Sequence, residues 1–174
     1  MIFWHLGGAF FLFRLAFKDP DADLRFLAIG ALLPDAIEWV VGWSVPAGGT
    51  GAGRLIGHSL AFCIGLLVAA LVLTRRGSRG RKRAVVVVVG AILHLVLDLM
   101  WIEPQLLLWP MLGYDLPAGI ETDWSGLARL SAADLLPIGQ EIVGLGYLAW
   151  LARRARLVDP RRRARLWRSG TLRT

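Results

Sequence analysis

Residues 84–102 read AVVVVVGAILHLVLDLMWI, an apolar run whose only ionisable side chains are His94 and Asp98. A run of this length measures about 28 Å as an α-helix, close to the roughly 30 Å thickness of the hydrocarbon core of a bilayer. Only helices and closed barrels cross lipid, and the run lacks the alternation of a barrel strand. It therefore predicts a membrane-spanning helix that carries two polar groups inside it.

Four further apolar segments have comparable lengths, at Ile2 to Phe17, Leu24 to Trp43, Ser59 to Thr74 and Leu135 to Ala152. The 174 residues are 56% hydrophobic and 19% charged, whereas a soluble domain carries about 25% charged residues. The single Cys63 excludes a disulfide scaffold. We expect an all-α polytopic membrane helical bundle with about five transmembrane helices over residues 1–152, followed by a basic cytoplasmic tail over residues 153–174.

The basic residues that give the net charge of +7 are strongly clustered, and they predict the orientation of this bundle. Loops rich in Lys and Arg stay on the cytoplasmic side of a membrane. With the loop 75–83 (RRGSRGRKR) and the tail inside, eighteen of the twenty basic residues lie at the cytoplasmic face, and only Arg54 and Arg129 lie outside. Five crossings then put the N-terminus outside and the C-terminus in the cytoplasm.

Ionisable side chains inside a membrane span cost about 2.5–3.5 kcal/mol each and usually mark function. With this topology and a rise of about 1.5 Å per residue, seven of them are predicted at one level in the outer half of the membrane, and they include all three histidines of the chain. The seven are His5, Asp35, Glu38, His58, His94, Asp98 and Glu141.

The spacing of these residues predicts a pocket for a divalent metal ion. His94 and Asp98 at i, i+4 share one helix face, as do Asp35 and Glu38 at i, i+3. Imidazole and carboxylate donors from several helices suit Zn²⁺, with Mn²⁺ or Fe²⁺ as alternatives. Two other interpretations stay open: His94 and Asp98 as a polar pair that joins helices, and the two glutamates as supporting or proton-relay groups.

Several motifs resemble those of bacterial inner-membrane proteins known as membrane-bound metal-dependent hydrolases, the YdjM-like family, which is distantly grouped with zinc-dependent phospholipase C. The motifs are FWHLGG (3–8), ALLPDAIEW (31–39), GHSLAF (57–62) and ILHLVLDLMWIEPQLLLWPMLG (92–113). The resemblance implies a bacterial cytoplasmic (inner) membrane protein. It implies metal ligands at Asp35, His58, His94 and Asp98, and His5 matches the N-terminal histidine of the family.

This chain departs from the family pattern at two positions near the implied ligands. Gly57 stands where the family usually has Thr before the histidine, and the second acid after the PD motif is Glu38, at +3 rather than an Asp at +2. These departures concern the surroundings of the ligands rather than the four ligands themselves.

The function expected from these residues is a membrane-embedded metal-dependent hydrolase, which cleaves a phosphoester or related bond of a lipid-like substrate at the periplasmic side. A bound cation activates water for such chemistry. Glu38, His5 and Glu141 are the candidate catalytic residues, as proton acceptor or donor, and His5 is also a candidate fifth ligand.

The alternative is a non-enzymatic membrane protein, either a metal or proton transporter or a scaffold subunit with a buried polar cluster. A transporter needs ionisable groups along a path to both faces of the membrane, whereas here they are predicted in the outer half only. This distribution favours a binding site over a transport path. We expect the lipid bilayer and a lipid-like substrate as partners and no nucleic acid, while a homo-oligomer or another membrane partner stays open. The tail DPRRRARLWRSGTLR (159–173) is typical of an amphipathic segment on anionic lipid.

Overall fold

The computed structural model describes residues 1–44, 56–113 and 132–172, and these residues form helices and turns without a β-strand. The long helices correspond to the five apolar segments of the sequence. They are α1 (Ile2–Ala16), α2 (Leu24–Ser44), α4 (Leu60–Leu73), α5 (Arg79–Leu97) and α7 (Ala132–Arg154). Shorter elements follow α5 and α7: a 3₁₀ turn (Met100–Ile102), α6 (Pro104–Leu107) and α8 (Pro160–Ser169). The all-α prediction is confirmed for the described residues.

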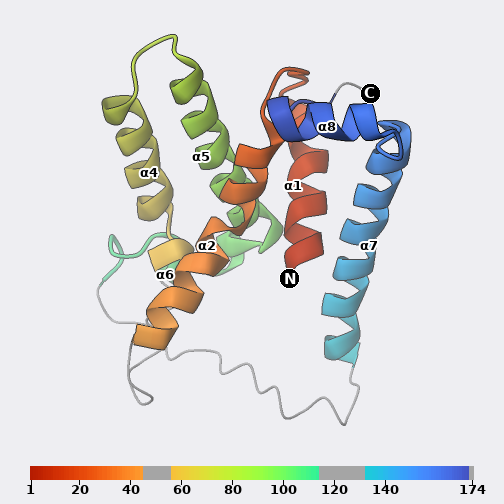
Figure 1. Ribbon diagram of the computed structural model, residues 1–174. Helices are drawn as coiled ribbons and strands as arrows, with labels where there is room; N and C mark the ends of the chain where they lie inside the picture. The colour runs from red at the N-terminus through yellow and green to blue at the C-terminus, as the bar shows by residue number, and fades with distance from the viewer. Residues whose placement is uncertain (45–55, 114–131, 173–174) are drawn as a thin grey trace.

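The five long helices run alternately up and down, and α8 lies at the end of the bundle where α7 finishes (Figure 1). Two helix pairs make the largest contacts, α2 with α5 and α1 with α7. α1 joins the pairs because it also contacts α2 and α5, and α4 packs on α5. The central helices α2 and α5 carry the PD and HxxxD motifs, so the packing brings these motifs together.

Glycines let the paired helices touch backbone to backbone. A Cβ built on Gly30 of α2 would lie 2.1 Å from the carbonyl oxygen of Val87, and one on Gly90 of α5 would lie 2.9 Å from the Gly30 Cα. Gly7 and Gly144 make the same kind of contact between α1 and α7, since a Cβ on Gly7 would lie 2.4 Å from the Gly144 oxygen. Small residues at such crossings are typical of helices that pack inside membranes.

Large apolar side chains cover the outer surface of the bundle. Leu73 of α4 is 82% exposed and Ile142 of α7 is 65% exposed, whereas a helix of a soluble protein turns its apolar face to the core. By length and composition, one described helix is suited to cross a membrane, at Leu135–Arg154, and α1 and α4 are apolar but shorter. The five helices are therefore confirmed, while five crossings and their orientation stay predictions.

The fourth helix differs from its predicted bounds of 84–102 at both ends. α5 begins earlier, at Arg79, because the Ser78 hydroxyl caps it by accepting a hydrogen bond from the Arg81 N–H. It ends at Leu97, since Leu99 adopts a left-handed conformation with φ 55° that an α-helix cannot continue. The predicted continuation of this helix to Ile102 is wrong for that reason, and Asp98 stands at the helix end.

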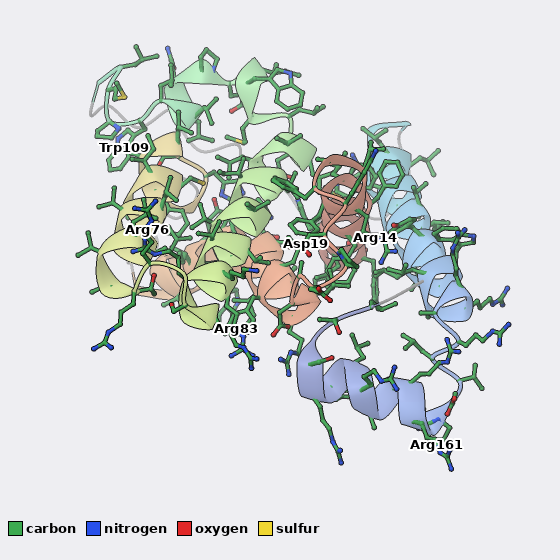
Figure 2. The ribbon with its side chains drawn as sticks, turned by 90° about the horizontal axis from the view of Figure 1, so that it is seen from above. Arg14, Asp19, Arg76, Arg83, Trp109 and Arg161 are labelled. Atoms are coloured by element: carbon green, nitrogen blue, oxygen red, sulfur yellow. The ribbon has the colours of Figure 1, made fainter. Side chains whose placement is uncertain are left out.

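The basic residues gather at one end of the molecule. Figure 1 places the end of α1, the start of α2, the α4–α5 loop with the start of α5, the end of α7 and α8 at the same end of the bundle, and these segments carry the basic residues, among them Arg14, Arg76, Arg83 and Arg161. Figure 2 looks onto that end. This clustering in space is what the positive-inside interpretation requires. The two residues expected on the opposite side, Arg54 and Arg129, lie outside the described residues.

The segment expected as a basic tail is packed on the bundle. α7 continues to Arg154, and Ala155 and Leu172 join a buried cluster with Phe13, Leu24 and Leu27. The Leu24 N–H donates to the Gly170 carbonyl at 2.8 Å. Gly170 is required there, because its φ is 69° and a Cβ would lie 1.6 Å from an Asp23 carboxylate oxygen. α8 is thereby fastened to the start of α2.

Candidate metal centre

His94 and Asp98 form the last turn of α5 and supply one side of a buried polar cluster. The His94 side chain is fully buried, and its Nδ1 lies 2.7 Å from the Ala31 carbonyl oxygen, to which it donates. Since a neutral imidazole has one donor and one acceptor, this bond leaves the Nε2 lone pair facing the cluster. That atom lies 3.3 Å from Asp98 Oδ2, so the two residues share a face as their spacing predicts.

Asp35 reaches the same cluster from α2, directly after Pro34. Proline has no backbone N–H and interrupts the hydrogen-bond ladder of the helix. Oδ1 of Asp35 lies 3.5 Å from His94 Nε2 and 3.8 Å from His58 Nε2. The Asp35 side chain is 38% exposed, whereas both histidines are buried, so the cluster opens to its surroundings on the Asp35 side.

His58 enters from the turn before α4. Its Nε2 lies 3.0 Å from His94 Nε2 and 3.2 Å from Asp98 Oδ2. The next residue, Ser59, caps α4 by accepting a hydrogen bond from the Phe62 N–H. Gly57 lets this turn lie against α2, because a Cβ there would be 2.7 Å from the Pro34 carbonyl oxygen. The Gly in place of the usual Thr therefore coincides with a close backbone contact.

The four facing atoms have the spacing of ligands around one metal ion. Asp35, His58, His94 and Asp98 each offer a ligand atom, and these atoms lie within 4.8 Å of one another. Five of the six separations run from 3.0 to 3.8 Å. Ligands about 2.0–2.2 Å from a tetrahedral ion are separated by about 3.3–3.6 Å. The donor set of two imidazoles and two carboxylates therefore fits a cation such as Zn²⁺, and the identity of the ion is open.

Further polar groups hold three of the four candidate ligands in place, and His5 is one of them. His5 of α1 contacts the other carboxylate oxygen of Asp98, with 2.7 Å between Nε2 and Oδ1, and its ring stacks on His94 at 4.0 Å between centroids. Nδ1 of His5 is fixed by the Met1 carbonyl at 2.6 Å. His5 therefore lies beside the four-residue group and orients Asp98.

Glu38 supports His58 from the opposite side of its ring. Its carboxylate makes an ion-pair contact with His58 Nδ1. Both contacting atoms are buried and neither has a well-oriented hydrogen bond among the described residues, so the ion pair is the interaction that satisfies them. A carboxylate on the outer nitrogen of a ligating histidine fixes its tautomer and raises its basicity. The position at +3 after Asp35 places Glu38 where it does this.

Glu141 lies apart from the four-residue group. Its carboxylate accepts a hydrogen bond from the Phe3 N–H at 2.8 Å, which ties α7 to the first turn of α1. Free N–H groups at a helix start favour a carboxylate there.

The sequence did not indicate the backbone carbonyls of Met1 and Ala31 as partners of His5 and His94, because backbone acceptors leave no signal in a sequence.

Fold and site together define an all-helical protein with a buried group of histidines and aspartates that could hold a metal ion. Residues 1–159 match the family model described as YdjM inner membrane protein, and the chain belongs to that family. The match confirms the YdjM-like resemblance and indicates the inner membrane. The more distant relation to phospholipase C stays a prediction. No curated protein and no solved structure matches the chain.

Proposed function

We propose that this protein is a multi-pass inner-membrane hydrolase that holds one divalent metal ion, preferably Zn²⁺, at Asp35, His58, His94 and Asp98. Its substrate is a phosphoester or related bond of a lipid-like molecule. The observation that carries the proposal is the near-tetrahedral spacing of four ligand atoms from α2, α5 and the turn before α4. The partners of the two histidines and of Asp98 add to it, because each orients one ligand.

The chemistry follows from which groups are held and which are accessible. A bound divalent cation supplies a water of lowered pKa and polarises the bond to be cleaved. Ala31 O, Glu38 and His5 hold His94, His58 and Asp98 respectively. Asp35 is the accessible member of the group, and its Oδ1 is the oxygen that faces the two histidines. We therefore assign to its other oxygen, Oδ2, the acceptance of a proton from incoming water, which requires that the ion accept a ligand beyond the four residues. The geometry favours supporting roles for Glu38 and His5.

The membrane placement of this proposal has three supports. The five long helices alternate in direction, their outer surfaces are apolar, and the basic residues share one end. With that end in the cytoplasm, His5 at the start of α1 and Asp98 at the end of α5 lie toward the periplasmic side. A lipid bond could then reach the site from within the outer half of the membrane.

Metal content is the first test. The full-length protein is purified in detergent, and its metals are measured by elemental mass spectrometry for wild type and for the double variant His94→Ala with Asp98→Ala. We expect wild type to retain an equimolar divalent metal and the double variant to lose it. Glu141→Gln is the control, because it removes a half-buried carboxylate outside the four-residue group and should leave the metal content unchanged. Absence of metal from wild type after reconstitution with Zn²⁺ would contradict the proposal.

Turnover is the second test, with a panel of lipid phosphoesters and the Asp35→Asn variant. We expect release of phosphate-containing products by wild type and a loss of about 10²-fold or more in Asp35→Asn, the range in which positioned acid–base groups contribute. Equal rates for the two proteins would assign the activity to a contaminant. Bound metal without any turnover would favour the transporter or scaffold alternative.

A further inference from the structure

α8 concentrates positive charge that the rest of the described structure does not neutralise. Five of its ten residues are arginines, at 161, 162, 163, 165 and 168, and all five are exposed. Among the described residues their one ion pair joins Arg162 to Asp159 at 4.0 Å. Like charges one turn apart on a helix repel each other. An anionic partner would remove that repulsion.

A cavity beside α8 combines these arginines with an apolar floor. It has a volume of about 570 Å³, and Arg161, Arg162 and Arg165 line it together with Ser169 and Thr171. Its apolar lining comes from Ala155, Leu157, Leu166 and Leu172, and Asp159 is its one carboxylate. Guanidinium groups bind phosphate oxygens in pairs. Phosphate beside hydrocarbon is the chemistry of a phospholipid headgroup.

The position of α8 suits a membrane surface. It lies at one edge of the basic end rather than over the centre of the bundle, as Figure 2 shows from that end. The Trp167 side chain is 72% exposed and Val158 is 87% exposed. Tryptophan and arginine together at the end of a helical bundle are typical of the headgroup region, where anionic lipid attracts basic residues.

The neighbouring cavity at this end suits an anion less well. It has a volume of about 780 Å³, and residues of α1, α5 and α8 line it together with five basic side chains, those of Arg79, Arg81, Lys82, Arg83 and Arg168. Three carboxylates, those of Asp19, Asp21 and Asp23, line the same space and would repel a phosphate. The charged residues that line each cavity sum to +2, so the preference for the α8 cavity rests on its one carboxylate against three.

We propose that α8 and its cavity bind the headgroup of an anionic phospholipid in the cytoplasmic leaflet, with the start of an acyl chain on the apolar floor. The proposal rests on the inner-membrane location and on the orientation with α8 inside. It does not rest on the metal site. Since Leu24 and Arg25 bond to the Gly170 and Trp167 carbonyls, the bound lipid would fix α8 against the start of α2.

The test is a titration of the full-length protein in a neutral detergent with phosphatidylglycerol or phosphatidylcholine, in which native mass spectrometry counts bound lipid. We expect tighter binding of phosphatidylglycerol and a fall of about thirty-fold in its apparent affinity for Arg161→Gln with Arg165→Gln. The matched control, Arg75→Gln with Arg76→Gln, removes the same charge from an exposed loop and should retain wild-type affinity. Equal losses in the two double variants would overturn the proposal.

Three further measurements distinguish a lipid headgroup from other anionic ligands. Arg161→Lys with Arg165→Lys keeps the charge and should keep most of the affinity, while a loss equal to that of the Gln variant would contradict a headgroup site. Inorganic phosphate should not displace the lipid at equal concentration, and displacement would show that lipid is not the ligand. Retention of a short DNA duplex in preference to phosphatidylglycerol would likewise contradict it. A circular dichroism spectrum and thermal unfolding curve like those of wild type show that the Gln variant is folded, and this readout does not depend on the metal proposal.

Discussion

At the scale of single residues, Glu38 and Glu141 show how similar sequence signals have different outcomes. Both are acids in apolar segments that were expected at the same membrane level. The structure places Glu38 against His58 and Glu141 against the first turn of α1. A depth estimate gives height along a helix but not rotation about its axis. Spacings of i, i+3 and i, i+4 show that two residues share a face of one helix. They therefore predict that Asp35 lies on the same face as Glu38, and His94 on the same face as Asp98.

Removal of the carboxylate behind His58 tests its supporting role. Glu38→Gln keeps the shape of the side chain but loses the charge that contacts His58 Nδ1. We expect metal affinity to fall about 10–100-fold, the usual effect of losing an outer partner of a ligating histidine. Competition with a chromogenic chelator measures it. Glu141→Gln should leave the affinity unchanged, and a comparable fall in both variants would show that the effect is not local.

Asp23 gives the protein a pH-dependent contribution to stability at its basic end. Hydrogen bonds from Arg25, with Arg83 also nearby, hold the pKa of Asp23 below its ordinary value of 3.8. A carboxyl with a lowered pKa in the folded state stabilises the protein above its unfolded pKa, and this stabilisation is lost as pH falls through the folded pKa. At neutral pH the contribution is therefore fully present.

Replacement of Asp23 tests this sign. Asp23→Asn is expected to lower the free energy of unfolding by about 1–3 kcal/mol at neutral pH, because charge-assisted hydrogen bonds are lost. The difference from wild type should shrink only as the pH falls below 3.8, the ordinary carboxyl value. Thermal unfolding in detergent, followed by circular dichroism at several pH values, checks it. A difference that grows on acidification would be inconsistent with the pairing.

At the scale of helices, the apolar runs predicted the five long elements, while their ends depended on single residues. Ser78 starts α5 five residues early and Leu99 stops it. The docking of α8 on α1 and α2 could not be predicted, since it depends on backbone carbonyls and on Gly170. These contacts join parts of the chain far apart in sequence, and no local pattern marks them.

The α2–α5 contact can be tested by adding one methyl group. Gly90→Ala adds a methyl group 2.6 Å from the Leu27 oxygen and 2.8 Å from the Ala31 nitrogen, so the helices must separate. We expect a loss of about 1–3 kcal/mol from overpacking, together with weaker metal binding, because Ala31 O holds His94. Gly65→Ala of α4 is the control, since nothing lies within 4 Å of its added Cβ. It should be neutral or slightly stabilising.

At the scale of the whole molecule, the distribution of basic residues predicts the orientation of the bundle in the membrane, and the described structure is consistent with that orientation. Reporter insertions after Gly77 and after Gly113 should give cytoplasmic and periplasmic signals respectively, with alkaline phosphatase active only outside and a fluorescent protein only inside. The reason is that loops rich in Lys and Arg resist translocation. Reversed signals would move the metal group to the cytoplasmic half and would remove the basis for an outer-leaflet substrate.

The glycine contact between α2 and α5 also has a consequence for ion selectivity. Gly30 and Gly90 set the distance between the helices that bear Asp35 and His94 at backbone contact, so those helices cannot move closer. Outward movement would break the bond between His94 and Ala31. Ca²⁺ requires six to eight oxygen ligands at about 2.3–2.6 Å, and this rigid group of four donors cannot widen to supply them. The fixed distance between α2 and α5 would thus favour a small cation over a large one such as Ca²⁺. The types of ligand atom would then discriminate among the small cations.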